Sequence, residues 1–127
     1  MEKTQIFVIS FFDLSSKKHR EKTSRYTDQA KQEAKDGMPG YEVLTWYDAG
    51  KPSKKCDEYR KRLDEMFDKC SIVYVGSSYH QTMYSRRFID KALEKGKFVI
   101  YKSTSRTRRK VRRMNERGED VSKIMIA

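Results

Sequence analysis

Short apolar runs alternate along the chain with longer segments in which polar and charged residues predominate. The first run, residues 6–12, is continuous and rich in β-branched and aromatic side chains. This composition is typical of a central strand that is buried on both faces of a sheet. Further runs predict strands over residues 41–47, 71–75, 97–102 and 121–126.

The segments between these runs have the periodicity of helices. The clearest helix is predicted over residues 56–69, where apolar side chains recur at i, i+4, i+7, i+8 and i+11 from Tyr59. Residues 17–36, 81–95 and 106–117 are also predicted to be helical, and glycine follows the first two of these segments.

This alternation predicts the fold class. Strands separated by helical segments of a dozen or more residues indicate βαβ crossovers and a mainly parallel sheet. We therefore expect a three-layer α/β fold, flavodoxin-like in outline, with four to five strands and helices on both faces. Residues 1–102 would form the α/β domain, and residues 103–127 would add a basic helix and a terminal strand to the same compact unit.

In such a sheet the ligand crevice lies beyond the carboxyl ends of the strands. Three loops, residues 10–13, 48–51 and 76–79, follow predicted strands and should meet there. The residues expected to face a ligand are Ser10, Phe11, Asp13, Trp46, Asp48, Gly76, Ser77, Ser78, Tyr79, Tyr84 and Phe88. Gly76, Ser77 and Ser78 would either offer backbone N–H groups and hydroxyls to a phosphate or form a turn that caps the next helix.

Composition restricts the class of protein. The chain has 127 residues, of which 36% are hydrophobic and 37% charged, and this indicates a thin core under a strongly solvated surface. No stretch approaches the roughly 18 to 20 apolar residues that span a bilayer. The two cysteines, Cys56 and Cys70, have neither zinc-site nor disulfide-framework spacing. We therefore expect a reduced, cytoplasmic protein without a metal site or a membrane partner.

The net charge of +11 indicates attraction to polyanions. Eight Lys or Arg and one Glu lie between residues 102 and 117, which is +8 −1 = +7 of that total. The residues expected to contact a polyanion are Arg106, Arg109, Lys110, Arg113 and Arg117. The alternative is a solvated helix that only raises solubility. Aromatic residues are not interleaved with this charge, so stacking on single-stranded bases is not indicated.

Three stretches of the sequence resemble TIR-like domains: IFVISF, YEVLTWYDAG and SIVYVGSSYHQTMYSRRFIDKALEKGKFVI. The resemblance is greatest to the bacterial TIR-like subgroup that includes the signal-producing component of Thoeris antiphage systems, and it covers about residues 4–102. The matching features are Ser10-Phe11, Asp48, Gly76-Ser77, Ile89, Ala92-Leu93 and Gly96-Lys97. The nucleoside deoxyribosyltransferase-like fold fits the last of the three stretches less well.

The resemblance implies a TIR fold and, for enzymatic members, cleavage of the nicotinamide–ribose bond of NAD. That reaction needs a carboxylate beside the ribose to stabilise an oxocarbenium-like transition state. The family's acid position, matched through Ala92-Leu93 and Gly96-Lys97, is occupied here by Phe88. Phe88 would serve either as core packing or as an aromatic wall of a ligand pocket. Asp13 and Asp48 are the candidate substitute carboxylates.

Three functions follow from these observations. The first is a TIR-like domain, in a signalling or phage-defence context, that binds NAD, an ADP-ribose derivative, another phosphorylated nucleotide or a TIR-type partner without ordinary NAD cleavage. The second is a protein that binds nucleic acid or another polyanion through the helix over residues 102–117. The third is an NAD glycohydrolase or cyclase that uses a displaced carboxylate. A homo-oligomer is compatible with each of them.

Overall fold

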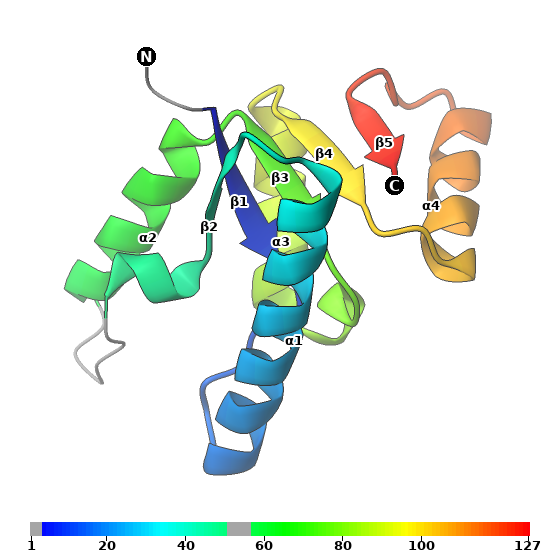
Figure 1. The fold of residues 1–127 in the computed structure, drawn as a ribbon. Coiled ribbons are helices and arrows are strands. Elements are labelled where there is room, and N and C mark those ends of the chain that lie inside the picture. The colour runs from blue at the N-terminus through cyan, green and yellow to red at the C-terminus, as the bar shows by residue number, and fades with distance from the viewer. Residues whose placement is uncertain (1–3, 51–56) are drawn as a thin grey trace.

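The computed structural model describes residues 4–50 and 57–127, which form a five-stranded parallel sheet with helices on both faces (Figure 1). Short 3₁₀ helices are labelled η. The elements in chain order are β1 (Gln5–Ile9), α1 (Lys17–Gly37), β2 (Glu42–Leu44), η1 (Trp46–Ala49), α2 (Asp57–Lys69), β3 (Ile72–Val75), η2 (Tyr79–Gln81), α3 (Met83–Glu94), β4 (Phe98–Tyr101), α4 (Ser105–Glu116) and β5 (Ile124–Ile126).

The strand order is β2-β1-β3-β4-β5, and every neighbouring pair is parallel. Helix α1 covers one face of the sheet, and α2, α3 and α4 contribute to the core on the other face. The predicted three-layer α/β fold is therefore confirmed. The order reverses between β1 and β3, and a ligand crevice is expected at the carboxyl ends of these two strands.

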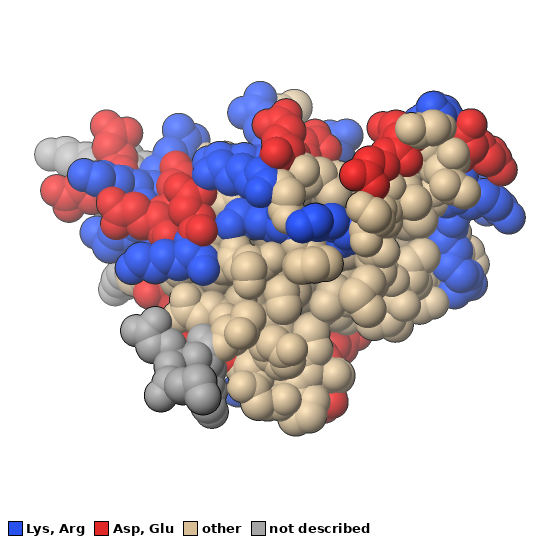
Figure 2. Space-filling model, turned by 90° about the horizontal axis from the view of Figure 1, so that it is seen from above, with Lys and Arg blue, Asp and Glu red and all other residues tan. Residues whose placement is uncertain are grey.

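The sheet is buried on both faces at its centre, as the apolar run at the N-terminus predicts. Phe7, Ile9, Val73 and Val75 point toward α2 and α3, and Ile6, Val8 and Tyr74 point toward α1. Helix α1 packs mainly against β1, β2 and β3, and Phe98 of β4 and Met125 of β5 are exposed on the same face. Figure 2 shows a broad area without charged side chains on the α1 side of the molecule.

The predicted strands are longer than the strands that form, most clearly at β1, β2 and β5. Strand β1 ends at Ile9 rather than at Phe12, and β2 contains only Glu42–Leu44 of the predicted residues 41–47. Strand β5 contains only Ile124–Ile126 of the predicted residues 121–126. The reason at β2 is a capping box, in which the Asp48 carboxylate accepts from the Thr45 backbone N–H at 2.8 Å. This box starts the 3₁₀ helix η1 and places Trp46 outside the sheet.

Smaller differences concern the helices. The helix predicted over residues 81–95 forms as α3, Met83–Glu94, and Gln81 belongs instead to the preceding η2. The predicted start of α2 at Cys56 lies outside the described residues. Cys70 is fully buried, and burial raises the pKa of its thiol to about 11. In the described part of the chain, no helix is long and apolar enough to cross a bilayer.

Gly76, which follows β3, is required by the close approach of α1. Its backbone N–H donates to the Ile9 carbonyl oxygen at 2.7 Å, which continues the β1–β3 pairing by one residue. A Cβ atom at this position would lie 2.6 Å from the Cβ of Ala30 on α1. Helix and strand tip therefore touch at the switch point, with no room for another carbon.

We expect Gly76→Ala to destabilise the protein by about 1–3 kcal/mol, the usual cost of overpacking. Gly37→Ala is the matched control, because a Cβ at the last residue of α1 meets nothing within 4 Å. Urea unfolding measures both variants. The double variant Gly76→Ala/Ala30→Gly should recover part of the loss, and no recovery would contradict the proposed contact.

Tyr101 is fully buried on β4, and its hydroxyl has no hydrogen-bond partner among the described residues. An unpaired buried hydroxyl costs about 1–3 kcal/mol. We expect Tyr101→Phe to stabilise the protein by about 1 kcal/mol, whereas Tyr74→Phe, which removes a hydroxyl that donates to Glu33 at 3.3 Å, should not.

The stabilisation by Tyr101→Phe should increase with alkaline pH. Burial raises the pKa of Tyr101 above its usual value of 10.0. Above pH 10 the unfolded tyrosine loses its proton before the folded one, so the parent protein loses stability that the phenylalanine variant keeps. Unfolding curves at pH 7 and pH 10.5 test this, and a variant less stable than the parent at pH 7 would contradict it.

Candidate functional site

A hollow lies at the carboxyl ends of the central strands, and aromatic side chains fill most of it. Its walls include four residues predicted to face a ligand, Ser10, Phe11, Trp46 and Phe88. The space left free in this switch-point hollow is about 20 Å³, which is room for about one water molecule. The predicted crevice therefore forms, but it is too small for a nucleotide.

The aromatic rings that close the hollow come from three parts of the chain. Phe12, which the sequence analysis did not assign to the site, lies 5.6 Å from Trp46 and 5.8 Å from Tyr84, ring centre to ring centre. Trp46 is held in place because its indole N–H donates to the Thr27 hydroxyl on α1 at 2.8 Å. Phe11 lies beneath α1, with the Lys22 ammonium 4.4 Å from its ring centre.

Phe88 is the largest departure from the resemblance, and it is half-buried on α3. Its ring centre lies 5.1 Å from Phe67, 5.8 Å from Phe7 and 6.2 Å from Tyr84. Both readings of Phe88 thus have structural counterparts: it packs on the core through Phe7 and Phe67, and it walls the switch-point hollow. A ring in these contacts supplies neither charge nor a hydrogen-bond acceptor.

A chain of buried hydroxyl groups fixes the loop after β1 to the start of α3. The Phe12 backbone N–H donates to Thr82 Oγ1 at 3.4 Å, and Thr82 Oγ1 donates to Ser85 Oγ at 2.8 Å. Ser85 Oγ in turn donates to the Ser10 carbonyl oxygen. Because the chain of donors ends on the backbone of Ser10, the polar groups at this strand tip are already paired.

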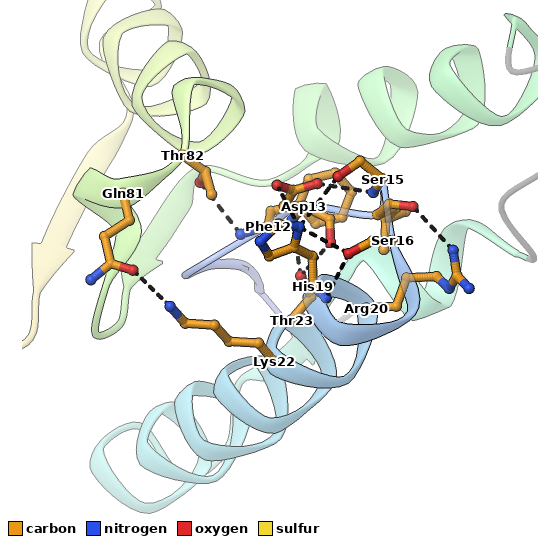
Figure 3. A network of polar contacts seen from close by, with 11 residues as sticks. Phe12, Asp13, Ser15, Ser16, His19, Arg20, Lys22, Thr23, Gln81 and Thr82 are labelled. Carbon is orange, nitrogen blue, oxygen red and sulfur yellow. Dashed lines mark hydrogen bonds and ion pairs between the residues drawn. The ribbon is translucent and has the colours of Figure 1, made fainter.

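Neither candidate substitute carboxylate lines the hollow. Asp13 accepts a hydrogen bond from the Ser15 backbone N–H at 2.9 Å and lies 3.6 Å from His19 (Figure 3). The hydrogen bonds from Ser15 hold the pKa of the Asp13 carboxyl below its usual value. Asp48 is exposed and serves as the capping group of η1. Both carboxylates therefore stabilise local turns.

The residues of the loop after β3 also make structural contacts. The N–H of Gly76 is used in the sheet, and Ser78 begins η2 in the left-handed conformation with φ 63°. Ser77 is half-buried. Tyr79 is buried, and its ring centre lies 5.7 Å from that of Tyr101 on β4. Residues 76–79 thus form a turn in which one N–H group that a phosphate would need is already bonded, but the Ser78 side chain makes no capping hydrogen bond to η2.

An open cleft of about 240 Å³ lies beside the hollow, between α2 and α3. We call it the α2/α3 cleft. It is lined by Arg60, Leu63, Asp64, Tyr84, Arg87, Phe88 and Lys91. Leu63 and Phe88 line both the hollow and the cleft, so the two spaces share a wall. Only Tyr84 and Phe88 of this set were predicted from the sequence.

The α2/α3 cleft combines aromatic and cationic groups. The guanidinium carbon of Arg60 lies 5.4 Å from the centre of the Tyr84 ring, within the range of a cation–π contact. A sequence signal for this face existed: Tyr84, Arg87, Phe88 and Lys91 are spaced i, i+3, i+4 and i+7 along one helix. It was not visible as a site because the facing residues come from α2.

The predicted polyanion-binding residues lie on α4 or, for Arg117, on the residue that ends it, and they divide into two groups. Arg106, Arg109, Arg113 and Arg117 are exposed. Lys110 instead turns inward, with its ammonium 5.4 Å from the Tyr79 ring centre and 5.6 Å from that of Tyr101. Burial lowers the pKa of Lys110. We therefore assign Lys110 to the packing of α4 rather than to its outer surface.

No protein-family model, curated protein or solved structure matches this chain. Functional assignment therefore depends on geometry. Within residues 4–50 and 57–127, no group of three His, Cys, Asp or Glu side chains is placed to hold a metal ion.

We expect Phe88→Glu to release no nicotinamide from NAD, because the hollow has room for only about one water molecule. The variant should also lose stability, and more so at pH 7 than at pH 4. Contact with Phe7 and Phe67 disfavours the ionised carboxylate and would raise its pKa above the usual value of about 4.3. The loss of stability caused by Phe88→Glu is therefore smaller while the new side chain is protonated, and it grows as pH rises.

Phe88→Gln is the matched control, since it is polar but cannot ionise. Its loss of stability should not change between pH 4 and pH 7 relative to the parent protein. Unfolding curves at the two pH values and chromatographic detection of nicotinamide provide the measurements. Nicotinamide release by the glutamate variant but not by the glutamine variant would contradict this expectation.

Proposed function

We propose that this protein is a TIR-like domain that binds an NAD-derived or other phosphorylated nucleotide in the α2/α3 cleft and does not cleave it. The observation that carries this proposal is a cleft of about 240 Å³ whose lining includes three cationic side chains and two aromatic rings. Small-molecule sites usually occupy about 300–1,000 Å³. The cleft therefore suits one nucleotide unit, partly exposed to solvent, better than a complete dinucleotide.

The charge of the α2/α3 cleft favours a phosphate. Arg60, Arg87 and Lys91 contribute three positive charges and Asp64 one negative charge, a balance of +3 −1 = +2. Arginine binds phosphate oxygens with two parallel N–H groups, which adds geometric selection to the electrostatic attraction. Tyr84 and Phe88 offer ring faces against which a base or a ribose can pack.

The same charges argue against cleavage of an N-glycosidic bond. An oxocarbenium-like transition state is positively charged, and it needs an uncompensated carboxylate beside it. Asp64 is the carboxylate at the α2/α3 cleft, and three cations line the cleft with it. A cationic transition state would be repelled there, whereas a phosphorylated ground state would be attracted.

The proposal is tested by calorimetric titration with AMP, ADP-ribose and NAD, with adenosine as the ligand that lacks phosphate. We expect AMP to bind at least tenfold more tightly than adenosine. Arg87→Ala should weaken AMP binding by about 10- to 100-fold, as expected for the loss of a charged hydrogen-bonding group. Asp64→Asn should strengthen binding, because it removes the negative charge from the cleft.

Lys61→Ala is the matched control. Lys61 lies on α2, one residue after Arg60, but it is exposed and does not line the cleft. Its substitution should leave AMP affinity within about twofold of the parent value. Equal affinities for AMP and adenosine, or an equal loss in Lys61→Ala and Arg87→Ala, would contradict the proposal. Release of nicotinamide from NAD, abolished by Asp64→Asn, would show an enzyme instead.

A further inference from the structure

Helix α4 presents a dense arginine surface on the outer edge of the molecule. It packs against β5, the last strand of the sheet, and it stands at the end of the row of helices (Figure 1). We define the α4 arginine surface by six exposed residues, Arg106, Arg108, Arg109, Arg112, Arg113 and Arg117. We propose that this surface binds the phosphate backbone of double-stranded nucleic acid.

The helix separates its two faces sharply. Thr107 and Met114 are buried, and Val111 packs on the core. Lys110, the one lysine of the helix, turns inward onto tyrosine rings, so the outer face carries its positive charge on arginine alone. The blue side chains at the right-hand edge of Figure 2 lie over α4.

The distribution of the two basic residue types argues against a purely solubilising role. Six of the twelve arginines of the chain lie on α4 or on the residue that ends it, whereas sixteen of the seventeen lysines lie elsewhere. Lysine would raise solubility equally well. Arginine differs in presenting a planar fork of N–H donors that matches phosphate oxygens.

The charges of α4 also act against the stability of the helix. Its first turn contains no acidic residue, although acidic groups there are favourable for the helix dipole. Arg108 and Arg112, like Arg109 and Arg113, are i, i+4 pairs of like charge, which destabilise a helix by about 0.2–0.5 kcal/mol each. A polyanionic partner would relieve this repulsion.

Most of the surface is free to bind. Arg117 pairs with Glu119 at 2.8 Å, and Arg108 donates to the Ser103 hydroxyl at 2.8 Å. Arg106, Arg109, Arg112 and Arg113 form no ion pair with any residue that the structure describes. Phosphate contacts at these four positions would not require an existing ion pair to break.

The geometry favours a duplex over a single strand. With about 100° per residue, Arg108 and Arg112 lie on one flank of the helix and Arg106, Arg113 and Arg117 on the other, with Arg109 between them. The major groove of a duplex is about 12 Å wide and admits a helix whose flanks then face both phosphate chains. The outer surface of α4 has no aromatic residue on which single-stranded bases could stack.

Fluorescence anisotropy with a labelled 20-base-pair duplex of arbitrary sequence, at 50 and 200 mM salt, tests the proposal. We expect the full chain to bind, with affinity that falls steeply with salt because counterions are released from the phosphates. The variant Arg109→Glu/Arg113→Glu should lose at least tenfold in affinity. The plot of log binding constant against log salt concentration should become less steep by about 2, because each lost phosphate contact reduces the size of the negative slope by about 0.9.

The matched control is Lys17→Glu/Lys18→Glu, which changes the net charge equally at two exposed positions in the first turn of α1. This variant should lose less than threefold in duplex affinity, and its affinity should depend on salt as steeply as that of the parent protein. Arg109→Lys/Arg113→Lys, which keeps the charge but not the fork of donors, should lose affinity to an intermediate degree. Circular dichroism of each variant verifies that the fold is retained.

Three results would overturn the proposal. The first is no duplex binding by the parent protein at 50 mM salt. The second is an equal loss of affinity in the α4 and α1 double variants, which would indicate a general charge effect. The third is tighter binding of a 20-nucleotide single strand than of the duplex. None of these results bears on AMP binding in the α2/α3 cleft, so the two proposals fail independently.

Discussion

The packing of aromatic rings at the switch point is the interaction on which the functional interpretation depends. In a parallel sheet with this strand order, the loops that follow β1 and β3 lead to helices on opposite faces and leave space for a ligand. Here Phe12, Trp46 and Phe88 occupy that space and leave room for about one water molecule. The rings stabilise the sheet end that would otherwise be open, and they displace any larger ligand from the position that the topology favours.

The polar groups around these aromatic rings are paired in hydrogen bonds. Hydroxyl groups of Thr82 and Ser85 bridge α3 to the backbone that follows β1. On the opposite side, Lys22 of α1 donates to Gln81 of η2 at 2.9 Å (Figure 3). The strand tips are thus tied to two helices from different layers, which favours a rigid scaffold over a mobile active-site loop.

Two surfaces with different chemistry lie outside this scaffold. The α2/α3 cleft is concave and combines rings with three cations, which is the chemistry of a small phosphorylated ligand. The α4 arginine surface is convex and almost purely cationic, which is the chemistry of an extended polyanion. They belong to different helices, so a protein with this fold can carry both functions or either one alone.

The periodicity of the sequence determined the fold class, because apolar runs of strand length alternate with helical segments. Local chemistry changed the boundaries: the Thr45–Asp48 capping box ends β2 early, and a capping residue is easily read as part of an apolar strand. Four of the predicted ligand-facing residues, Ser10, Phe11, Trp46 and Phe88, do meet at the switch point. The sequence also located the arginines of α4, since they are close together in the chain.

Tertiary structure alone decided what these residues can do. Whether Phe88 leaves a pocket or fills one depends on Phe7 and Phe67, which are distant in the sequence. The α2/α3 cleft joins Arg60 to Arg87 across two helices, and Lys110 turns inward only because tyrosines of η2 and β4 receive it. Periodicity assigns a side chain to a face of its own element, but the groups opposite that face are set by packing between elements.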